Sequence, residues 1–281
     1  MKNRIRWGEG QSARSDNTLN RRGMTHFGYR LVPESEKRLY VKKLFDIVAQ
    51  KYDFMNTLFS FGIHFLWKRS AVKMLELGPG QSVIDLCGGT GDLSMLAAKA
   101  VGSSGHIILY DINRTMMMRG LPKIRHSEHG KHIYHVQGDA EEISLPDQTV
   151  DAIMVGFGVR NLTHIEKGLT EMYRVLKPGG KLVCLDFSKP TAPAFRFLYD
   201  CYSFYIIPLL GSIMVGSWSA YRYLYESIHM FLSPAELTEM LKRVGFFRVT
   251  HRRMTRGIAV IHLAEKRELL YAEEDQVSVT I

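Results

Sequence analysis

Short apolar runs and helically spaced apolar stripes alternate through the middle of the chain. Five runs predict strands, at residues 82–86, 106–111, 133–137, 151–155 and 181–186. The segments between them space their apolar residues as amphipathic helices do. Such an alternation is typical of βαβ units, so the pattern predicts an α/β fold built on a mostly parallel sheet.

The segments on either side of this region extend the predicted fold. Helical periodicity dominates residues 29–77, where we expect Ser35 to cap a helix. The apolar stripe of that helix consists of Val41, Leu44, Phe45 and Val48. Near the end, the pattern predicts a helix at 234–243 and strands at 246–252 and 257–263. Two late strands after a helix favour an antiparallel hairpin that closes the sheet.

Residues 189–233 interrupt this alternation. They are rich in aromatic and apolar residues, and no charged residue occurs from Cys201 to Tyr221. That length matches a membrane span. Pro208, with the glycines and serines around it, makes the stretch poorly hydrophobic for a span. We therefore expect these residues to form a cap over the carboxyl edge of the sheet.

The glycine-rich turn after the first predicted strand indicates a ligand site. In Cys87-Gly-Gly-Thr-Gly91 the glycines lack Cβ atoms, so the backbone can turn tightly and approach a bound molecule. A dinucleotide site reads G-x-G-x-x-G instead. Asp85 and Asp92 flank the turn, and we expect their charges to repel a diphosphate. They suit a ligand with an ammonium group and a sulfonium, which S-adenosylmethionine (SAM) carries.

Two more acids stand at strand ends, as a nucleoside site requires. Asp111 ends the second predicted strand, where a carboxylate can accept hydrogen bonds from both ribose hydroxyls. Asp139 follows the third strand within Gly138-Asp-Ala140, where a side chain can meet the adenine amine. The alternative is a glycine turn that only packs a helix on a sheet. Acids at three successive strand ends favour the nucleoside site.

The charge and the cysteine content limit the cellular compartments and partners that we expect for the protein. Part of the net charge of +9 lies in residues 1–28, which hold six Lys and Arg against two acids. This arm either touches RNA or anionic lipid or is a disordered extension. We expect one domain over residues 29–266, followed by an acidic tail at 267–281. The three cysteines lack metal-ligand spacing, which indicates reduced thiols, a cytoplasmic setting and no metal site.

Other segments carry the signatures of a known family. Tyr52-Asp-Phe-Met-Asn56, followed by Ser60, His64 and Trp67, resembles the first signature of the ubiquinone/menaquinone biosynthesis C-methyltransferases. The segment Arg174–Ser188 resembles the second signature. Further matches to family patterns lie at residues 25–28, 157–161 and 221–224. The resemblance therefore extends over nearly the whole chain.

This resemblance implies a fold, a reaction and a set of cofactor contacts. The fold is that of the class I SAM-dependent methyltransferases, a Rossmann-like, seven-stranded, mostly parallel sheet, here with N-terminal helices and an apolar cap insertion. The reaction places a methyl group from SAM on a ring carbon of a prenylated hydroquinone. The implied SAM contacts are Thr90, Asp111, Asp139 and Ala140, and the glycine turn adds Gly88.

The chain departs from the family pattern mainly on the substrate side. Asp186 stands where the second signature usually has Glu, and Gly156 stands where many members have Ser. The segment Gly216-Ser-Trp-Ser219 stands where one or two acids are expected. Gly156 favours demethylmenaquinol, in menaquinone biosynthesis, over the corresponding benzoquinol of ubiquinone biosynthesis.

The implied reaction needs a proton acceptor, because the hydroxyl beside the attacking carbon must lose its proton. Arg160, after the fourth strand, is the candidate catalytic residue. It can hold the phenolate or orient a water that takes the proton, although Arg itself stays charged. His64, Tyr221 and Arg222 are candidate substrate contacts. The cap would line an entrance that opens onto a bilayer, and basic surface would hold the enzyme at anionic lipid.

The expected partners follow from this reaction. They are a prenylated quinol and, as a peripheral contact, the inner membrane, with a homodimer or a quinone-biosynthesis complex left open. Two interpretations of another class compete, an RNA methyltransferase and a SAM-binding protein without catalysis. RNA enzymes tend to carry an Asn-Pro-Pro-Tyr-like motif or a Pro-Cys nucleophile. Residues 156–161 read Gly-Phe-Gly-Val-Arg-Asn and no Pro-Cys pair occurs, so we expect no specific nucleic-acid partner.

Overall fold

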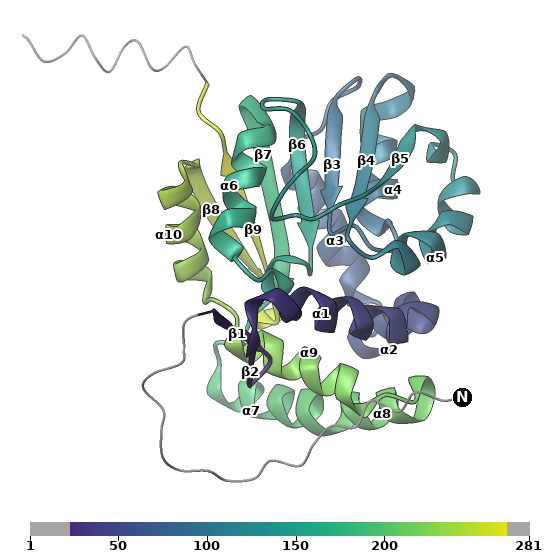
Figure 1. Cartoon of the computed structure of the whole chain (residues 1–281), viewed down its shortest axis with the longest axis vertical. Coiled ribbons are helices and arrows are strands. Elements are labelled where there is room, and N and C mark those ends of the chain that lie inside the picture. Colours follow the sequence, from purple (N-terminus) through teal and green to yellow (C-terminus); the bar gives the residue numbers. More distant parts are fainter. Residues whose placement is uncertain (1–22, 269–281) are drawn as a thin grey trace, which may run out of the picture.

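The computed structural model describes residues 23–268 and has a seven-stranded sheet at its centre (Figure 1). The strand order is β5-β4-β3-β6-β7-β9-β8, with β9 antiparallel to both of its neighbours and the other pairs parallel. The strands are β3 (Ser82–Leu86), β4 (His106–Asp111), β5 (Ile133–Gln137), β6 (Val150–Gly156), β7 (Leu176–Phe187), β8 (Phe247–Met254) and β9 (Ala259–Glu265). The predicted α/β fold and its closing antiparallel hairpin are confirmed.

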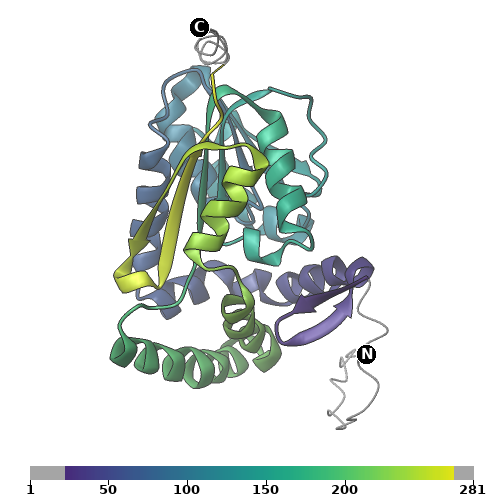
Figure 2. The same cartoon turned by 90° about the vertical axis from the view of Figure 1, so that its left-hand side faces the viewer.

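Helices cover both faces of the sheet (Figure 2). One face carries α3 (Ile63–Met74), α4 (Asp92–Val101) and α5 (Arg114–Arg125), and the other carries α6 (Ile165–Val175) and α10 (Pro234–Val244). Val83 and Ile84 of the central strand are both fully buried, one in each core, because successive side chains of a strand alternate between faces. Burial on both faces explains why β3 is almost continuously apolar.

The N-terminal part of the described chain lies across the carboxyl edge of the sheet (Figure 1). It consists of the hairpin strands β1 (Met24–Phe27) and β2 (Arg30–Pro33) and the helices α1 (Glu34–Val48) and α2 (Tyr52–Ser60). The hairpin begins before the domain boundary predicted at residue 29. Most of the predicted basic arm and acidic tail, residues 1–22 and 269–281, lies outside the described residues.

The prediction that Ser35 caps a helix is wrong. Pro33 occupies the N-cap position of α1, with φ −56° and ψ 137°, and Ser35 lies inside the first turn. The hairpin therefore leads the chain into the helix two residues earlier than the sequence pattern suggested. The apolar stripe of α1 is confirmed, since Val41 and Val48 are buried and the other two members pack against the same cores.

The fifth central strand begins earlier than the predicted residue 181, because residues 177–180 belong to it as well. β7 begins at Leu176, and its pairing with β6 shifts register between Val150 and Ala152. The amide of Gly179 donates to the carbonyl of Lys266, and the amide of Lys266 donates to the carbonyl of Gly180. These bonds hold the segment against the end of the neighbouring strand, which is why it does not form a free turn.

The cap predicted at residues 189–233 is a helical layer beyond the carboxyl edge of the sheet (Figures 1 and 2). It contains α7 (Pro193–Cys201), a π-helical segment (Tyr202–Ile206), α8 (Ile207–Val215) and α9 (Trp218–Met230). Ile207 and Tyr221 pack with Val48 and Met55 in a small core of their own. The continuous helical stretch Pro193–Val215 meets the length and apolarity of a membrane span, but it packs here as part of the cap.

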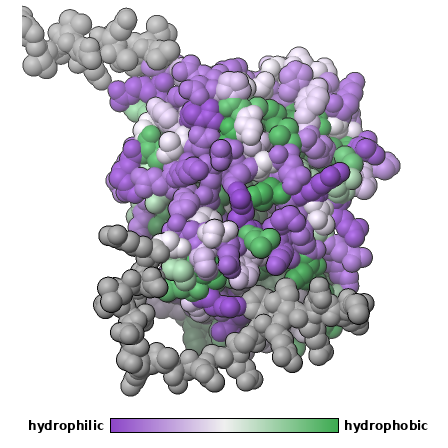
Figure 3. All heavy atoms as spheres, in the orientation of Figure 1, coloured by the Kyte–Doolittle hydropathy of each residue, from purple (hydrophilic) through white to green (hydrophobic). Residues whose placement is uncertain are grey.

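The face drawn in Figure 3 is largely hydrophilic. Hydrophobic side chains show there as small separate patches, over the upper part of the view as well as around the level of α1.

Candidate active site

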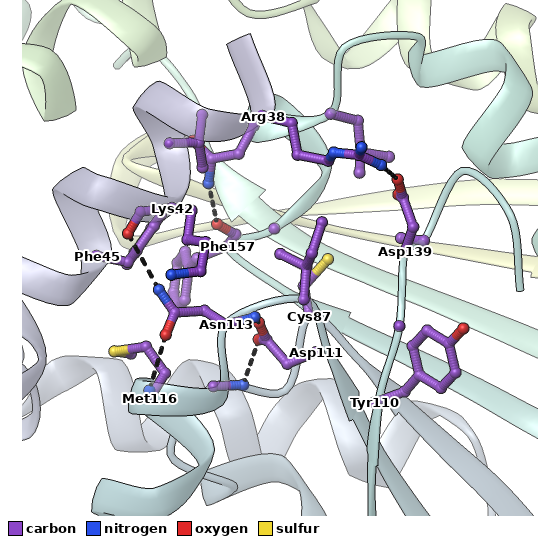
Figure 4. Close-up of a pocket in the computed structure, with 18 of the residues that line it drawn as sticks. Arg38, Lys42, Phe45, Cys87, Tyr110, Asp111, Asn113, Met116, Asp139 and Phe157 are labelled. Carbon is purple, nitrogen blue, oxygen red and sulfur yellow. Dashed lines mark hydrogen bonds and ion pairs between the residues drawn. The ribbon is translucent and has the colours of Figure 1, made fainter. Parts of the chain in front are cut away.

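Two cavities adjoin at the carboxyl edge of the sheet. The first lies between α1 and the loops after β3, β4 and β5 (Figure 4). The second, with a volume of about 360 Å³, lies between the N-terminal helices, the loop after β6 and the cap. Both cavities are lined by Phe45, Tyr52, Phe157 and Asn161. These four residues form the wall that separates the two cavities.

Asp111 is fixed in the wall of the first cavity by backbone amides. Its carboxylate accepts hydrogen bonds from the amide of Gly89 at 2.8 Å and from the amide of Asn113 at 2.7 Å (Figure 4). Burial raises the pKa of the Asp111 carboxyl, and the two amide donors oppose that effect. The side chain is thus held in one orientation before any ligand arrives, which suits an acceptor for hydroxyl groups.

Asp139 and Ala140 lie at the other end of this cavity. Asp139 accepts a hydrogen bond from the amide of Glu141 at 2.9 Å and pairs at 2.6 Å with Arg38, which reaches across from α1 (Figure 4). Gly138, just before them, has no room for a side chain, since a Cβ there would lie 2.0 Å from the Tyr110 hydroxyl. The chain can therefore pass this close to Tyr110, which also lines the cavity, only because residue 138 is glycine.

The residues of the first cavity fit a nucleoside. Fixed carboxylates face it at two points, and between them lie apolar side chains that suit a flat base, namely Ile112, Met116, Ala140 and Leu162. Cys87, at the start of the glycine turn, also lines it in a left-handed conformation with φ 56°. Burial raises the pKa of the Cys87 thiol well above its ordinary value, so this residue has the properties of a packed side chain rather than a nucleophile.

Asp85 and Asp92 do not face either cavity, contrary to the argument that their charges select the ligand. Asp85 accepts from the amide and hydroxyl of Ser94 at 2.9 and 2.6 Å, and burial raises its pKa to about 7. Asp92 pairs with Lys68 at 2.6 Å and with Lys123. Burial alone would raise the pKa of Asp92, but these lysines hold it at about 2. Of these four acids, Asp111 and Asp139 are the two that line the first cavity.

Thr90 lies beside the first cavity, and its hydroxyl is already engaged. It donates at 2.6 Å to Asp53 of α2, whose other oxygen accepts from Lys123 at 2.6 Å. Neither Thr90 nor Gly88 is among the residues that line the cavity. The hydrogen bonds among Thr90, Asp53 and Lys123 instead connect the glycine turn to α2, which lines part of the second cavity.

The second cavity is aromatic and contains a buried cation. Trp67, Phe157 and Phe187 form a cluster with ring centroids 4.6 to 6.4 Å apart. The side chain of Arg160 is 6% exposed, and its Nη1 donates to the carbonyl of Phe157 at 2.7 Å and to the carboxylate of Asp186. Arg160 Nε is buried and has no hydrogen-bond partner among the described residues.

His64 presents a free lone pair in the same region. The hydroxyl of Thr57 donates to the carbonyl of Asp53 at 2.9 Å, so its oxygen can only accept from His64 Nε2, 3.3 Å away. Nε2 therefore carries the proton, and Nδ1 is an acceptor with no partner among the described residues. Burial, with the charge of Lys68, lowers the pKa of His64 to about 4, so the ring is neutral at neutral pH.

The other two predicted substrate contacts differ in placement. Tyr221 lines the second cavity, is 7% exposed and packs edge-on against Phe59. Burial raises the pKa of Tyr221, so its hydroxyl stays protonated. Arg222 is not among the lining residues; it pairs with Glu226 at 2.9 Å and lies over the ring of Phe204. Its placement gives no support to a direct contact with substrate.

Sequence reasoning missed most of the wall between the cavities. Phe45 was assigned only to the apolar stripe of α1, and Tyr52, Phe157 and Asn161 were noted only as parts of family motifs. The apolar stripe and the family motifs were the features of the sequence that pointed to these four residues. The sequence does not show that the segments with Phe45, Tyr52 and residues 157–161 meet between the two cavities.

The sequence matches a family model and many curated proteins. Residues 32–266 match the model of the ubiE/COQ5 methyltransferase family. The "Ubiquinone/menaquinone biosynthesis C-methyltransferase UbiE" of Methylococcus capsulatus is 45% identical over 86% of this chain and 98% of that protein. The protein of the same name from Hahella chejuensis is 42% identical over 88% of this chain and 100% of its own length.

Solved structures with the same fold are more distant in sequence. A SAM-dependent methyltransferase from Aquifex aeolicus aligns with a TM-score of 0.51 and 22% identity, over 70% of this chain and 88% of that one. A SAM-dependent methyltransferase from Thermotoga maritima, described as a histamine N-methyltransferase candidate, aligns with a TM-score of 0.55 and 19% identity, over 80% and 99%. These likenesses show the class I methyltransferase fold.

Proposed function

Because this chain belongs to the ubiE/COQ5 methyltransferase family, we propose that it methylates a ring carbon of demethylmenaquinol. Family membership makes it a SAM-dependent C-methyltransferase of ubiquinone/menaquinone biosynthesis, as the sequence signatures predicted. The choice of the naphthoquinol rests on Gly156, which lines the first cavity without a side chain. The observation that carries the proposal is the pair of cavities, one acidic and one aromatic, with a common wall.

We assign the cofactor to the first cavity. SAM, when bound there, supplies a methyl group on a positively charged sulfur. Asp111 would accept from the ribose hydroxyls, and Asp139 and Ala140 would contact the adenine. Gly88 and Thr90 would act through the turn, which Thr90 fastens to α2 by its bond to Asp53.

The quinol ring would lie in the second cavity, against the wall shared with the first. Its carbon becomes nucleophilic when the neighbouring hydroxyl loses a proton, because the phenolate pushes electron density onto the ortho position. The hydroxyl proton would pass to water. After the carbon has gained the methyl group, its hydrogen would leave as a proton and the phenolate oxygen would take one up, so the ring is aromatic again and one proton is released in all. The cavity's contribution is to hold the ring at the wall and to exclude water.

Arg160 would hold the phenolate, since it carries a permanent charge and a buried Nε–H without a partner. A cation with little access to water stabilises an anion far more strongly than one in solvent. His64 would accept a hydrogen bond from a quinol hydroxyl through Nδ1, and Tyr221 would contact the ring or its tail. Arg160 and His64 would thereby gain the polar partners that Nε and Nδ1 lack among the described residues.

We further propose that the enzyme works at the cytoplasmic face of the inner membrane, as a peripheral protein. A prenylated quinol is too apolar to accumulate in water, so the enzyme must meet it at lipid or on another protein. The net charge of +9 favours an anionic surface. Association into a homodimer or a quinone-biosynthesis complex is compatible with this role.

A direct assay tests the proposed function. Purified protein is incubated with SAM and either demethylmenaquinol or the matching benzoquinol, both with short tails, and the products are identified by mass spectrometry. The proposal predicts methylation of both rings with a clearly higher kcat/KM for the naphthoquinol. A higher kcat/KM for the benzoquinol overturns the choice of substrate, and methylation of neither ring overturns the function.

A further inference from the structure

We propose that the outer side of the cap is a membrane-docking face, which seats the protein on an anionic bilayer with the mouth of the second cavity toward the acyl chains. The docking face consists of Phe61, Phe197, Leu198, Tyr205, Leu209 and Ile213, all exposed apolar side chains. The inference that a quinol tail enters here rests on the proposed function. The docking itself is a separate claim and is tested separately.

The exposed apolar side chains form a stripe along one helical stretch. Phe197, Tyr205, Leu209 and Ile213 recur at multiples of four residues, and they extend over about 24 Å at 1.5 Å per residue. Ile213 is 70% exposed and Phe197 68% exposed. A surface helix of a water-soluble protein normally shows polar residues on that side. The helical stretch Pro193–Val215 instead exposes an apolar stripe to solvent.

The opposite side of the same stretch is fixed to the protein. Ile207 and Gly211 are buried, and a Cβ on Gly211 would lie 1.9 Å from the ring of Tyr221. The helix therefore cannot leave the cap and cross a bilayer without losing this packing. Only 22% of its apolar window is buried inside the protein, which is low for a core helix. A helix held on one side and apolar on the other suits a position in the membrane surface.

Phe61 adds an aromatic wedge beside the stripe. It ends α2 in a left-handed conformation, with φ 50° and ψ 35°, yet its side chain is 80% exposed. Strain of this kind at a bulky residue persists where it serves a purpose. Phe61 lines the second cavity and its ring stacks with that of Tyr202, whose hydroxyl donates to the carbonyl of Phe59. The cavity therefore reaches the surface between Phe61 and the cap.

Basic side chains stand at both ends of the stripe. At its start, Arg196 is about half exposed and Arg256 lies over the ring of Phe195. At its other end, exposed Lys51 donates to the carbonyl of Met214. Within the stretch, the acid is Asp200, which faces His229 at 3.4 Å and Arg196 at 3.8 Å. An apolar stripe between basic groups complements anionic lipid headgroups above an acyl layer.

The position of the stripe supports a bilayer as the occupant. Among the described residues, the α7 and α8 helices form the outermost layer beyond the carboxyl edge of the sheet (Figures 1 and 2). A protein partner bound along this layer would cover the mouth of the cavity and block a long tail. A bilayer leaves the mouth open to the phase in which the tail is dissolved.

Vesicle binding tests the docking. Full-length protein is sedimented with vesicles of phosphatidylcholine alone or mixed with phosphatidylglycerol. We expect clearly stronger binding to the anionic vesicles and at least a tenfold loss of that binding in the double variant Phe197→Ser, Ile213→Ser. The matched control is Tyr134→Ser, which removes an exposed aromatic from β5 and should bind as the parent does.

Activity separates this inference from the proposed function. The double variant should methylate a short-tailed soluble quinol at the parent rate, because neither residue lines a cavity, and should lose most activity on a long-tailed quinol in vesicles. Unchanged vesicle binding by the double variant overturns the docking. So does a dimer in size-exclusion chromatography that the double substitution splits, since a second copy would then cover the face. If the parent itself fails on the short-tailed quinol, the proposed function falls while the binding result still decides the docking.

Discussion

The two cavities differ in how their polar groups are satisfied. In the first, both carboxylates are held by amide donors or by Arg38 before a ligand is present. In the second, Arg160 Nε and His64 Nδ1 are buried without partners among the described residues. A site with fixed acceptors is organised for a ligand of constant shape, whereas unsatisfied groups in an aromatic cavity are organised for a reaction.

This difference predicts that substitutions in the two cavities will separate cofactor binding from turnover. Groups in the first cavity should change the affinity for SAM and leave the quinol KM unchanged. Groups in the second should change kcat or the quinol KM and leave SAM binding unchanged. Substitutions of Arg160 and Asp111 test this separation directly. Substitution of His64 tests the protonation state of an acceptor in the second cavity, and substitution of Asp53 tests the link between the two cavities.

Replacing Arg160 with Ala should have the largest effect. It removes the proposed phenolate partner, which should lower kcat about 100-fold or more. It also leaves Asp186 buried without its cation, which should cost about 3–5 kcal/mol of unfolding free energy. Steady-state kinetics, chemical denaturation and calorimetry with SAM measure the three quantities.

Two companion variants keep the Arg160 result interpretable. Arg160→Lys retains the charge for Asp186, so it should fold better than the Ala variant and still lose most of kcat. Arg222→Gln removes a nearby cation that does not line the cavity, and it should stay within about twofold of the parent. If Arg160→Lys is fully active, the guanidinium has no specific role and the assignment fails.

Replacing His64 with Asn should change the pH dependence of stability. The folded imidazole binds a proton only below about pH 4, whereas the unfolded one binds it up to its ordinary pKa near 6.5. The unfolded state therefore holds more protons between these two pH values. The unfolding free energy rises with pH across that window and reaches a plateau above it. The difference between the folded and unfolded pKa of His64 corresponds to a rise of about 3 kcal/mol in unfolding free energy across the window. The His64→Asn variant should lack this rise.

Denaturant titrations at several pH values between 4 and 7 measure this slope. His262, whose pKa burial also lowers to about 4, should keep its own contribution in the variant. The profile should therefore flatten without disappearing. An unchanged slope would show that the His64 ring is not kept neutral by its surroundings, and its role as an acceptor in the second cavity would be lost.

Replacing Asp111 with Asn should weaken SAM binding and little else. The variant loses a charged acceptor, and hydrogen bonds to charged groups contribute about 1.5–3 kcal/mol, or roughly 10- to 150-fold in affinity. Calorimetry with SAM gives the change, and kinetics at saturating SAM should show an unaltered quinol KM. Asp151→Asn, at the far edge of the sheet, is the matched control. Equal losses in both variants would contradict a specific ribose contact.

Replacing Asp53 with Asn should give the smallest effect but alter both cavities. Asp53 lies on α2 and bonds both Thr90 and Lys123, so it links the helix beside the quinol to the turn beside the cofactor. The ion pair is partly exposed, and such pairs contribute about 0.2–1 kcal/mol. We expect a modest rise in both the SAM Kd and the quinol KM. A change in only one of them would show that the two cavities are not coupled through this network.

The sheet was predictable because burial leaves a clear mark on sequence. β3, β4 and β5 match the predicted strands in both bounds, since each is an apolar run between turn residues. Asp111 and Asp139, predicted as cofactor contacts from their places at strand ends, line one cavity because the carboxyl ends of neighbouring parallel strands meet at one edge. For these residues, position along the strand determines position in the site.

The partners of the acids were not predictable in the same way. Asp92 was expected to face the ligand, but Lys68 and Lys123 arrive from two other helices and take its charge. Thr90 was expected at the cofactor, but Asp53 from α2 takes its hydroxyl. Such contacts join segments far apart in sequence, and no local pattern records them. The second cavity, assembled from distant helices, is hidden for the same reason.

The most direct test of the central claim follows the methyl group itself. The enzyme is given SAM with a deuterated methyl group and short-tailed demethylmenaquinol, and the product is analysed by mass spectrometry and NMR. The account predicts that the intact deuterated methyl appears on the ring carbon, and that Arg160→Ala forms this product about 100-fold more slowly or worse while still binding SAM. A label on a quinol oxygen, or no labelled quinol from protein that binds SAM, would contradict it.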